Sequence, residues 1–180
     1  MKTVAFQGEP GAFSEEAAIA LCGPECALLP CRTFQAVAEA VLSKKADCGV
    51  LPMENSIIGP IHSSVEVLEQ NGLKAEQAIE MPIHHYLLGV KGAEIGKLKK
   101  VISHPAALAQ CELFFEKYPF VKMEEHYDTA GAARDVSKLK DPLVAAIASR
   151  RAGLRYKLEV LQTDIEDSPD NRTRFIVVTR

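Results

Sequence analysis

The chain has 180 residues, of which 47% are hydrophobic and 25% are charged, and its formal net charge at pH 7 is -3. A chain of this size and composition buries a substantial core, either as one domain or as two small lobes. Its slight excess of acidic residues gives no global basic field for nucleic acid or an acidic membrane, so we expect neither as a partner.

The N-terminus runs from Met1 directly into an apolar segment without the features of a signal peptide, and no later run approaches membrane-spanning length. A cytoplasmic location is therefore expected. The five cysteines are an odd number, and the closest three, Cys22, Cys26 and Cys31, lack the paired spacing of a zinc site. We expect reduced thiols packed as small apolar side chains, and no bound metal.

Short apolar runs alternate with amphipathic stretches along the chain, which predicts an α/β fold with largely parallel strands. In chain order, the predicted strands are residues 3–7, 47–51, 79–90, 100–103, 143–147 and 173–179, with shorter strands near 28, 122 and 159. The predicted helices are residues 13–22, 34–44, 60–70, 105–117, 129–138 and 149–155.

One segment breaks this alternation, because residues 77–90 are too long for an ordinary strand and carry Pro82. A crossing between two lobes would explain the segment. With a return crossing near residues 165–173, the first lobe is predicted to hold residues 1–78 plus 166–180, and the second lobe residues 79–165. The cleft between the lobes is then the expected binding site.

The first strand is followed by residues 7–14, QGEPGAFS, which hold two glycines and lead into a helix. The glycines allow a tight turn, and the start of the helix can present backbone amides to an anion. The segment lacks the glycine spacing of a dinucleotide site and the ending of a phosphate loop. An ordinary loop, with Ser14 as a helix residue, stays the competing interpretation.

Three polar residues, Glu54, Asn55 and Ser56, lie between apolar neighbours just before a helix predicted to start at Pro60. They can form part of a binding site. Alternatively, Asn55 and Ser56 cap the following helix, and both roles can coexist.

In the second lobe, residues 102–105 and 127–131 are again polar turns leading into helices that begin with small residues. Ser103 and either Asp128 or Thr129 are predicted caps. Helices whose amino ends point into one cleft would receive a ligand with two negative groups, such as a dicarboxylate.

These turns resemble the characteristic segments of the prephenate dehydratase family, in the same order and over nearly the whole chain. The matching segments are GEPGAFS (8–14), PMENS (52–56) with Gly59, SHP (103–105), ALAQC (107–111), DTAGAA (128–133), AAIAS (145–149), IED (165–167) and NRTRF (171–175). The last is similar to the Thr-Arg-Phe motif that marks the active site in this family.

The resemblance implies a fold like that of periplasmic binding proteins, with two α/β lobes and the active site in the interlobe cleft. It implies a carbon-oxygen lyase of phenylalanine biosynthesis that converts prephenate to phenylpyruvate with loss of water and carbon dioxide, without a cofactor. Thr173 is then the catalytic hydroxyl, acting with Asn55, Ser103 and Gln110. The substrate contacts implied are Ser14, Glu54, Ser56, Gly59, Thr129, Ala130, Arg174 and Phe175.

Two residues depart from the family pattern. Ala106 stands where glutamine is usual after the Ser-His-Pro segment, and Glu66 stands where aspartate is common. Arogenate dehydratase, which performs the same elimination on the amino-acid analogue, remains an alternative. So does a small-anion-binding module without catalysis, although such a module has no reason to carry the 171–175 segment.

Family members are oligomeric, so a homodimer is expected. They usually carry a phenylalanine-sensing ACT domain after the catalytic part, whereas this sequence stops seven residues beyond Thr173. We therefore expect phenylalanine to leave the activity unchanged, since allosteric coupling requires a second site.

Other titratable residues have simpler interpretations. His84 and His85 are predicted to lie on a strand, where adjacent side chains point to opposite faces and cannot easily share a metal. Glu54, Glu166 and Asp167 act as acids only if buried beside the substrate, and solvation or contacts with helix ends explain most loop carboxylates. Thr173 is too weak an acid to titrate near neutrality, so we expect a positioned hydrogen-bond donor.

Overall fold

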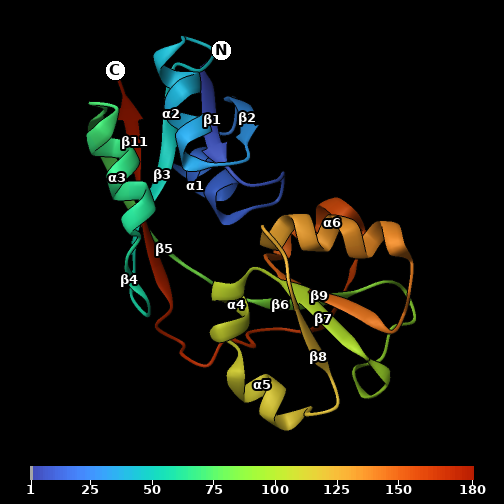
Figure 1. Cartoon of the computed structure of the whole chain (residues 1–180). Helices are drawn as coiled ribbons and strands as arrows, with labels where there is room; N and C mark the ends of the chain where they lie inside the picture. The colour runs from blue at the N-terminus through green and yellow to red at the C-terminus, as the bar shows by residue number, and fades with distance from the viewer. Residues whose placement is uncertain (1) are drawn as a thin grey trace. The chain divides into compact units, whose positions relative to one another are not determined.

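The computed structural model describes residues 2–180, and these form two compact units (Figure 1). The first unit holds the residues up to Glu9, Phe13–Ile83 and Asp170–Arg180, and the second holds Pro10–Ala12 and His84–Pro169. Apart from the short excursion at Pro10–Ala12, the chain changes units at 83/84 and 169/170, a few residues after the expected changes at 78/79 and 165/166. Each unit has its own sheet and core.

The first unit is built on a sheet with the strand order β2-β1-β3-β11-β5, and β4 pairs with β3 at its side. β1 runs parallel to β2 and β3, whereas β11 runs antiparallel to β3 and β5. The strands are β1 (Thr3–Gln7), β2 (Ala27–Cys31), β3 (Cys48–Asn55), β4 (Gly59–Pro60), β5 (Lys74–Pro82) and β11 (Arg172–Thr179).

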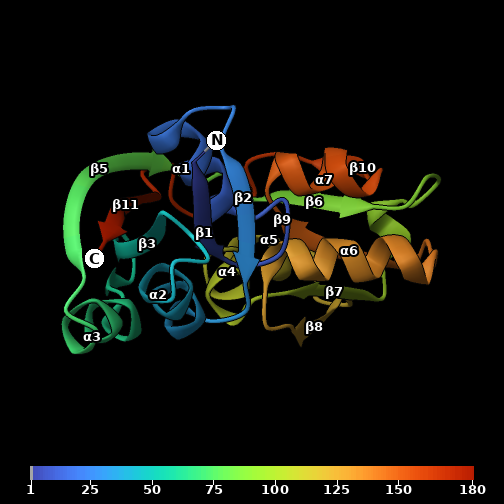
Figure 2. The ribbon, with the colours of Figure 1, turned by 90° about the horizontal axis from the view of Figure 1, so that it is seen from above.

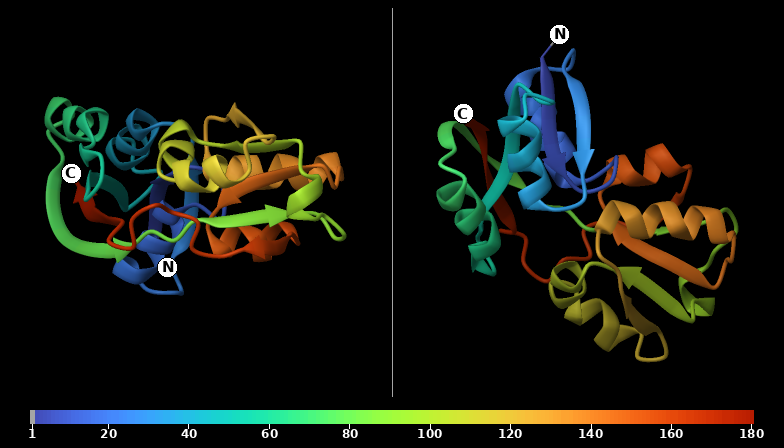
Figure 3. Two further views of the ribbon diagram at one scale, coloured as in Figure 1. Left: turned by 90° about the horizontal axis from the view of Figure 1, so that it is seen from below. Right: turned by 45° about the horizontal axis from the view of Figure 1, so that its top comes forward.

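Three helices cover this sheet: α1 (Phe13–Cys22), α2 (Phe34–Leu42) and α3 (His62–Gln70). α2 and α3 pack against each other and against β3 (Figure 3). The apolar face of α2, with Val37 and Val41, meets Leu51 of β3 and Val178 of β11 in one buried cluster. This core makes β3 and β11 rigid supports for the polar residues at their ends.

The second unit has a sheet with the order β10-β6-β9-β7-β8, in which β7 is parallel to β8 and β9, and β6 is antiparallel to β9 and β10. Its strands are β6 (Tyr86–Gly89), β7 (Lys100–Ser103), β8 (Lys122–Glu125), β9 (Val144–Ala148) and β10 (Glu159–Gln162). The helices are the 3-10 turn η1 (Ile95–Lys97), α4 (Pro105–Ala109), α5 (Glu112–Lys117), α6 (Thr129–Leu139) and α7 (Arg150–Tyr156).

α6 packs against β9 and against α7 (Figure 2). The second unit has its own hydrophobic core, in which Leu87 and Ile147 of the sheet pack with Phe114 and Phe115 of α5. The α/β class and most of the predicted elements are thus confirmed, with β1, α1 and β7 at the predicted bounds.

Several expectations are wrong in detail. The strands are not largely parallel, because β11, β6 and β10 each pair antiparallel with their neighbours. The predicted strand 79–90 is two strands, with residues 83–85 between them, so His84 and His85 do not lie on a strand. The predicted helix start at Pro60 lies two residues too early, because Gly59 and Pro60 pair with β3 instead.

The predicted helix 105–117 is broken into α4 and α5 at Gln110 and Cys111. Gln110 is the C-cap of α4, and the carboxylate of Asp167 accepts the backbone N–H groups of Glu112 and Leu113 at 2.8 and 3.0 Å. A side chain more than fifty positions away thus starts a new helix where local periodicity predicts a continuous one.

All five cysteines are free thiols, and Cys48 and Cys111 are buried, as predicted. Among the helices of residues 2–180, none combines the length and the apolar character that a membrane crossing requires.

Candidate active site

Two of the predicted catalytic residues are cross-strand neighbours in the first sheet. Asn55 ends β3, and Thr173 lies directly opposite it near the start of β11. Both are almost completely buried, with exposed fractions of 4% and 7%. Strand pairing on both sides of β11 therefore fixes the backbone of Thr173.

The amide of Asn55 has a single orientation that satisfies its neighbours. Its Oδ1 accepts the backbone N–H groups of Ile57 and Ile58 at 2.9 and 3.2 Å. Its Nδ2 is therefore turned to the other side, where it donates to Thr173 Oγ1 at 2.9 Å and to Asn171 Oδ1 at 2.8 Å. Because Thr173 Oγ1 accepts this bond, the hydrogen of the threonine hydroxyl is not used in it.

Asn171 belongs to the predicted site segment, but sequence reasoning gave it no role. It is 2% exposed, and its side chain holds Asn55 from a position 116 residues later in the chain. Its place two residues before Thr173 was the available signal. A contact across such a separation cannot be read from local spacing.

Ser56 closes the same corner of the first unit. Its hydroxyl donates to the carbonyl oxygen of Asp170 at 2.7 Å and accepts the backbone N–H of Arg172 at 2.9 Å. Neither Asn55 nor Ser56 caps α3, whose N-cap is Ile61, so the capping interpretation is wrong. Both residues instead fasten the chain that leads into β11.

Gly59 pairs with Asn55 at the β3–β4 turn. Its φ of 78° lies in the left-handed region, which explains glycine at this position. Ser14, the second residue of α1, is buried.

Side chains along β11 point alternately to the two faces of the sheet, and this places the remaining predicted substrate contacts of the first unit on different faces. The β11–β5 register is unbroken from Thr173 to Ile176, so Thr173 and buried Phe175 share one face. Arg174 is exposed on the opposite face, where its cross-strand neighbour is the exposed Glu54. The structure thus brings Phe175 to the side of Thr173, and does not bring Glu54 or Arg174 there.

In the second unit, Ser103 ends β7 and is completely buried. Its hydroxyl donates to the carbonyl oxygen of Ile147 in β9 at 2.6 Å. The predicted cap role is wrong, because the N-cap of α4 is His104, whose Nδ1 accepts the N–H of Ala106. Ser103 keeps its oxygen lone pairs as acceptors.

Gln110 is paired with His85, which sequence reasoning missed. His85 Nε2 lies 2.8 Å from Gln110 Oε1, and the two side chains are 2% and 9% exposed. Burial lowers the pKa of His85, so its ring is neutral at pH 7 and Nε2–H is the donor. This bond turns the NH2 group of Gln110 away from His85.

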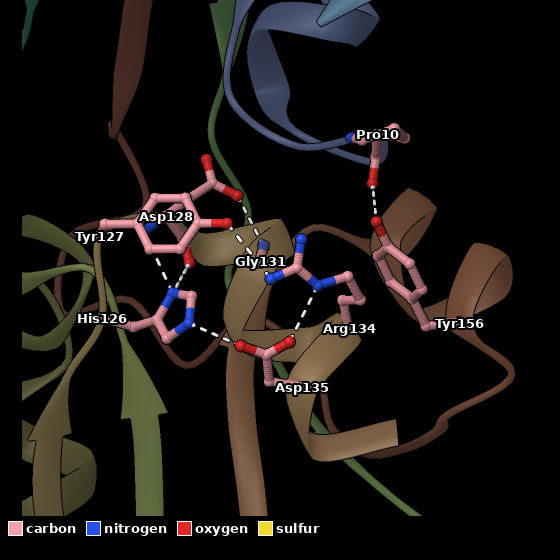
Figure 4. Close-up of polar contacts among 8 residues, drawn as sticks. All are labelled: Pro10, His126, Tyr127, Asp128, Gly131, Arg134, Asp135 and Tyr156. Atoms are coloured by element: carbon pink, nitrogen blue, oxygen red, sulfur yellow. Dashed lines mark hydrogen bonds and ion pairs between the residues drawn. The ribbon is translucent and has the colours of Figure 1, made fainter. Parts of the chain in front are cut away.

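The first turn of α6 holds the predicted contacts Thr129 and Ala130. The N-cap is Asp128, as predicted, and its carboxylate accepts the N–H of Gly131 at 2.6 Å (Figure 4). A Cβ at Gly131 would come within 2.8 Å of the His126 ring, which explains glycine there.

A polar cluster supports this turn (Figure 4). His126 Nδ1 lies 2.9 Å from the carbonyl oxygen of Asp128, and His126 Nε2 lies 3.0 Å from the carboxylate of Asp135. Arg134 donates to Asp135 at 2.8 Å and to the hydroxyl of Tyr127 at 3.2 Å. The hydrogen bond from Arg134, helped by His126, lowers the pKa of Asp135.

An open pocket of about 380 Å³ lies beside this cluster, lined by His104, Pro105, Glu125, His126 and Tyr127. These residues lie at the carboxyl ends of the parallel strands β7 and β8, and Glu125 is the last residue of β8. In α/β proteins, the carboxyl ends of parallel strands are the usual place for ligands.

Residues 10–12, which belong to the second unit, are held at α7. Ser149, the N-cap of α7, donates to the carbonyl oxygen of Gly11 at 2.6 Å. The hydroxyl of Tyr156 donates to the carbonyl oxygen of Pro10 at 2.7 Å (Figure 4). The first glycine-rich segment is therefore anchored by its backbone.

Two mixed α/β units joined by two crossings define a fold of the periplasmic-binding-protein class. A putative methionine-binding lipoprotein from Bacillus subtilis has a TM-score of 0.50 to this chain at 13% identity. The superposition covers 99% of this chain and 83% of the lipoprotein. At that identity the likeness concerns the fold alone.

The family model described as prephenate dehydratase matches residues 4–180, so the chain belongs to the prephenate dehydratase family. Arogenate dehydratase 1 of Petunia hybrida is 43% identical in an alignment 180 residues long, which covers 98% of this chain and 42% of that protein. The chain spans less than half the length of the curated relatives to which it is similar.

Two solved structures are similar over almost the whole chain. The prephenate dehydratase of Arthrobacter aurescens in complex with L-Phe has a TM-score of 0.90 at 29% identity, covering 99% of this chain and 60% of its own. GqqA, described as a novel type of quorum quenching acylase, has a TM-score of 0.86 at 32% identity. That superposition covers 99% of this chain and 64% of GqqA.

Proposed function

We propose that this chain carries prephenate dehydratase activity and acts as a carbon-oxygen lyase in phenylalanine biosynthesis. The observation that carries the proposal is the buried hydroxyl of Thr173, which accepts a hydrogen bond from Asn55 and keeps its own hydrogen for another acceptor. That acceptor is the departing ring hydroxyl of prephenate.

The reaction needs few protein groups. The carbon-carbon bond to the ring carboxylate breaks, and its electron pair enters the ring as carbon dioxide leaves. The ring carbon-oxygen bond breaks at the same time, and the departing hydroxide takes one proton to become water. Phenylpyruvate with an aromatic ring remains, and the aromatic stabilisation favours the products.

Catalysis then consists of stabilising charge that develops on the departing oxygen. A preorganised donor in a buried site costs no reorganisation at the moment of reaction. Asn55 supports Thr173 in this role, because its Nδ2 fixes the direction of the hydroxyl oxygen and withdraws electron density from it. Thr173 transfers no net proton of its own and passes on a proton supplied from elsewhere.

Groups of the second unit are proposed to bind the carboxylates of the substrate. The first turn of α6, at Thr129 and Ala130, presents backbone N–H groups and the positive end of the helix dipole. The NH2 group of Gln110 adds a polar contact to a carboxylate, whereas Ser103, whose hydroxyl hydrogen is donated to Ile147, is proposed only as an acceptor toward a hydroxyl of the substrate. No step in this scheme uses a metal, so a strong chelator should leave the turnover within about twofold of its original value.

Arogenate dehydratase activity is the second candidate, because the relative from Petunia hybrida bears that name at 43% identity. Arogenate has an amino group where prephenate has a keto group, while the eliminated groups are the same. Thr173 and Asn55 would act in the same way on either substrate. The preference between prephenate and arogenate therefore depends on the groups that contact the side chain of the substrate.

A side-by-side assay with prephenate and arogenate tests both candidates. Formation of phenylpyruvate from prephenate, with the larger kcat/KM for that substrate, would support the proposal. A larger kcat/KM for arogenate would assign the chain to the second candidate. Binding of either compound without product would support a small-anion-binding module and overturn both.

We further propose a homodimer in the cytoplasm. Five free thiols suit a reducing compartment. Large apolar side chains such as Leu113 and Leu154, which are 60% and 73% exposed, provide surface for subunit contact. Light scattering of the purified chain should give twice the mass of 19.6 kDa, and a monomer would refute the dimer.

A further inference from the structure

A histidine and two carboxylates to which the proposed reaction gives no role meet in the second unit. His84 Nδ1 lies 3.1 Å from Asp164 Oδ1 and 2.9 Å from Glu166 Oε1. One ligand atom from each residue lies within 4.8 Å of the others. The sequence gave no sign of this cluster, because His84 lies eighty or more positions before the two carboxylates and was expected on a strand.

Hydrogen bonds alone do not satisfy the histidine and both carboxylates at the same time. A ring nitrogen carries at most one hydrogen, which points along one direction in the plane of the ring. His84 Nδ1 therefore cannot donate a full hydrogen bond to both carboxylates at once. A small divalent cation there would be a common partner for the nitrogen and both oxygens.

The distances fit the coordination shell of such a cation. Metal-ligand bonds of about 2.1 Å set at right angles place neighbouring ligand atoms about 3.0 Å apart. The observed separations from His84 Nδ1 are 3.1 and 2.9 Å. A tetrahedral shell with the same bond length would require about 3.4 Å. These two separations are close to those of a six-coordinate shell, which would leave three positions for water.

The cluster is held in place on one side and open on the other. The side chain of Glu166 is only 4% exposed, and its second oxygen accepts the backbone N–H of His85 at 2.8 Å. Such a bond orients a carboxylate ligand before a metal arrives. The side chains of His84 and Asp164 are 46% and 60% exposed, so an ion and its waters can enter from solvent.

We propose that His84, Asp164 and Glu166 form a binding site for one divalent cation of the first transition row. Mixed imidazole and carboxylate ligands suit Mn2+ or Zn2+ better than Ca2+. The ion ties residue 84 to residues 164–166, next to the buried His85–Gln110 pair. It takes no part in the elimination proposed above.

Mn2+ is the best probe, because it is a hard ion with little preference for the five thiols of the chain. Calorimetric titration of the metal-free protein with MnCl2 should show one equivalent bound, with the six-line resonance of free Mn2+ lost in parallel. Because only the folded protein presents the site, bound Mn2+ should also raise the melting temperature.

Two substitutions test the ligands. His84→Ala and Asp164→Asn should each weaken Mn2+ binding by at least about tenfold. Asn suits position 164, where φ is 51° and the left-handed backbone must be kept. His62→Ala is the matched control, since His62 is an exposed histidine on α3.

Absence of binding by Mn2+ and by Zn2+ at millimolar concentration would overturn the site. Binding that is equally tight in both ligand variants would do the same, because the ion would then lie elsewhere. If His84→Ala fails to fold, Asp164→Asn decides alone. The turnover assay is separate: loss of Mn2+ binding with unchanged turnover supports this site and leaves the proposed function intact.

Discussion

The two units present their polar side chains on different supports. In the first unit, Thr173 and Asn55 lie on paired strands with β-sheet neighbours on both sides. In the second unit, Gln110 caps a five-residue helix and Thr129 begins α6. A strand buried in a sheet fixes a side chain more closely than a helix end does. We therefore propose that groups of the first unit act in the transition state and that groups of the second unit bind the substrate.

The largest effect expected from this comparison is at Thr173. Thr173→Val keeps the shape and suits a strand, but removes the hydroxyl. We expect kcat to fall by a factor of about one hundred or more with little change in KM, and Thr173→Ser to retain partial activity. Steady-state kinetics on prephenate, with circular dichroism and thermal melting, measures this.

Thr179→Val is the matched control, since Thr179 lies on the same strand and bonds only the exposed carboxylate of Glu76 among the contacts described. It should leave kcat unchanged. A folded Thr173→Val protein with near-normal kcat would remove Thr173 from the mechanism and turn attention to Asn55, Ser103 and Gln110.

A smaller effect on kcat is expected at Asn55. Asn55→Asp keeps the oxygen that accepts the N–H groups of Ile57 and Ile58, and replaces the Nδ2 donor with an acceptor. We expect kcat to fall roughly tenfold and the free energy of unfolding to fall by about 1–3 kcal/mol, since Asn171 and Thr173 lose a buried donor. Urea unfolding and kinetics measure both.

Asn71→Asp, at a half-buried C-cap, is the control for the change in charge. If Asn55→Asp lost stability but kept the original kcat, Asn55 would be a structural residue only.

In the second unit, Gln110→Ala should change KM more than kcat. Removing the amide takes away a proposed contact and leaves the buried Nε2–H of His85 without this acceptor, which costs about 1–3 kcal/mol of stability. We expect KM to rise several-fold, with Gln35→Ala, an exposed site on α2, as the unchanged control. A fall in kcat alone would contradict the division between strand-borne catalysis and helix-borne binding.

The smallest effect is expected at the support of α6. Since the pKa of Asp135 lies below its ordinary value of 3.8, its contacts with Arg134 and His126 stabilise the fold above that pH. The contribution is lost as the pH falls through the lowered pKa. The side chain is 42% exposed, so solvent screening keeps the contribution below about 1 kcal/mol.

Asp135→Asn should therefore be slightly less stable than the wild type in urea at neutral pH, and the difference should vanish in acid. A difference that grows as the pH falls would mean that the stabilising role of this carboxylate has been misassigned.

The sequence predicted most elements because their signals are local. The apolar run of β1 and the periodic spacing of α1 do not depend on distant residues, and both have the predicted bounds. The site segment 171–175 was found through resemblance rather than periodicity, since threonine in a strand has an ordinary explanation.

The rest could not be predicted because it depends on contacts between distant positions. Asp167 breaks the helix between α4 and α5, Asn171 holds Asn55, and Glu166 meets His84. The antiparallel return of β11 is a similar case, since hydrophobic alternation does not reveal strand direction. Each of these features requires the topology to be known first.

The place of β11 in the first sheet has a consequence for the order of assembly. It lies between β3 and β5, which do not pair with each other. While a ribosome is still adding residues before 172, both of those strands have an open edge, whereas every strand of the second sheet has already been made by residue 162. The same late insertion covers the edge of β3 and one edge of β5 and brings in Thr173, so the hydroxyl proposed to act in catalysis takes its place only when the first sheet is complete.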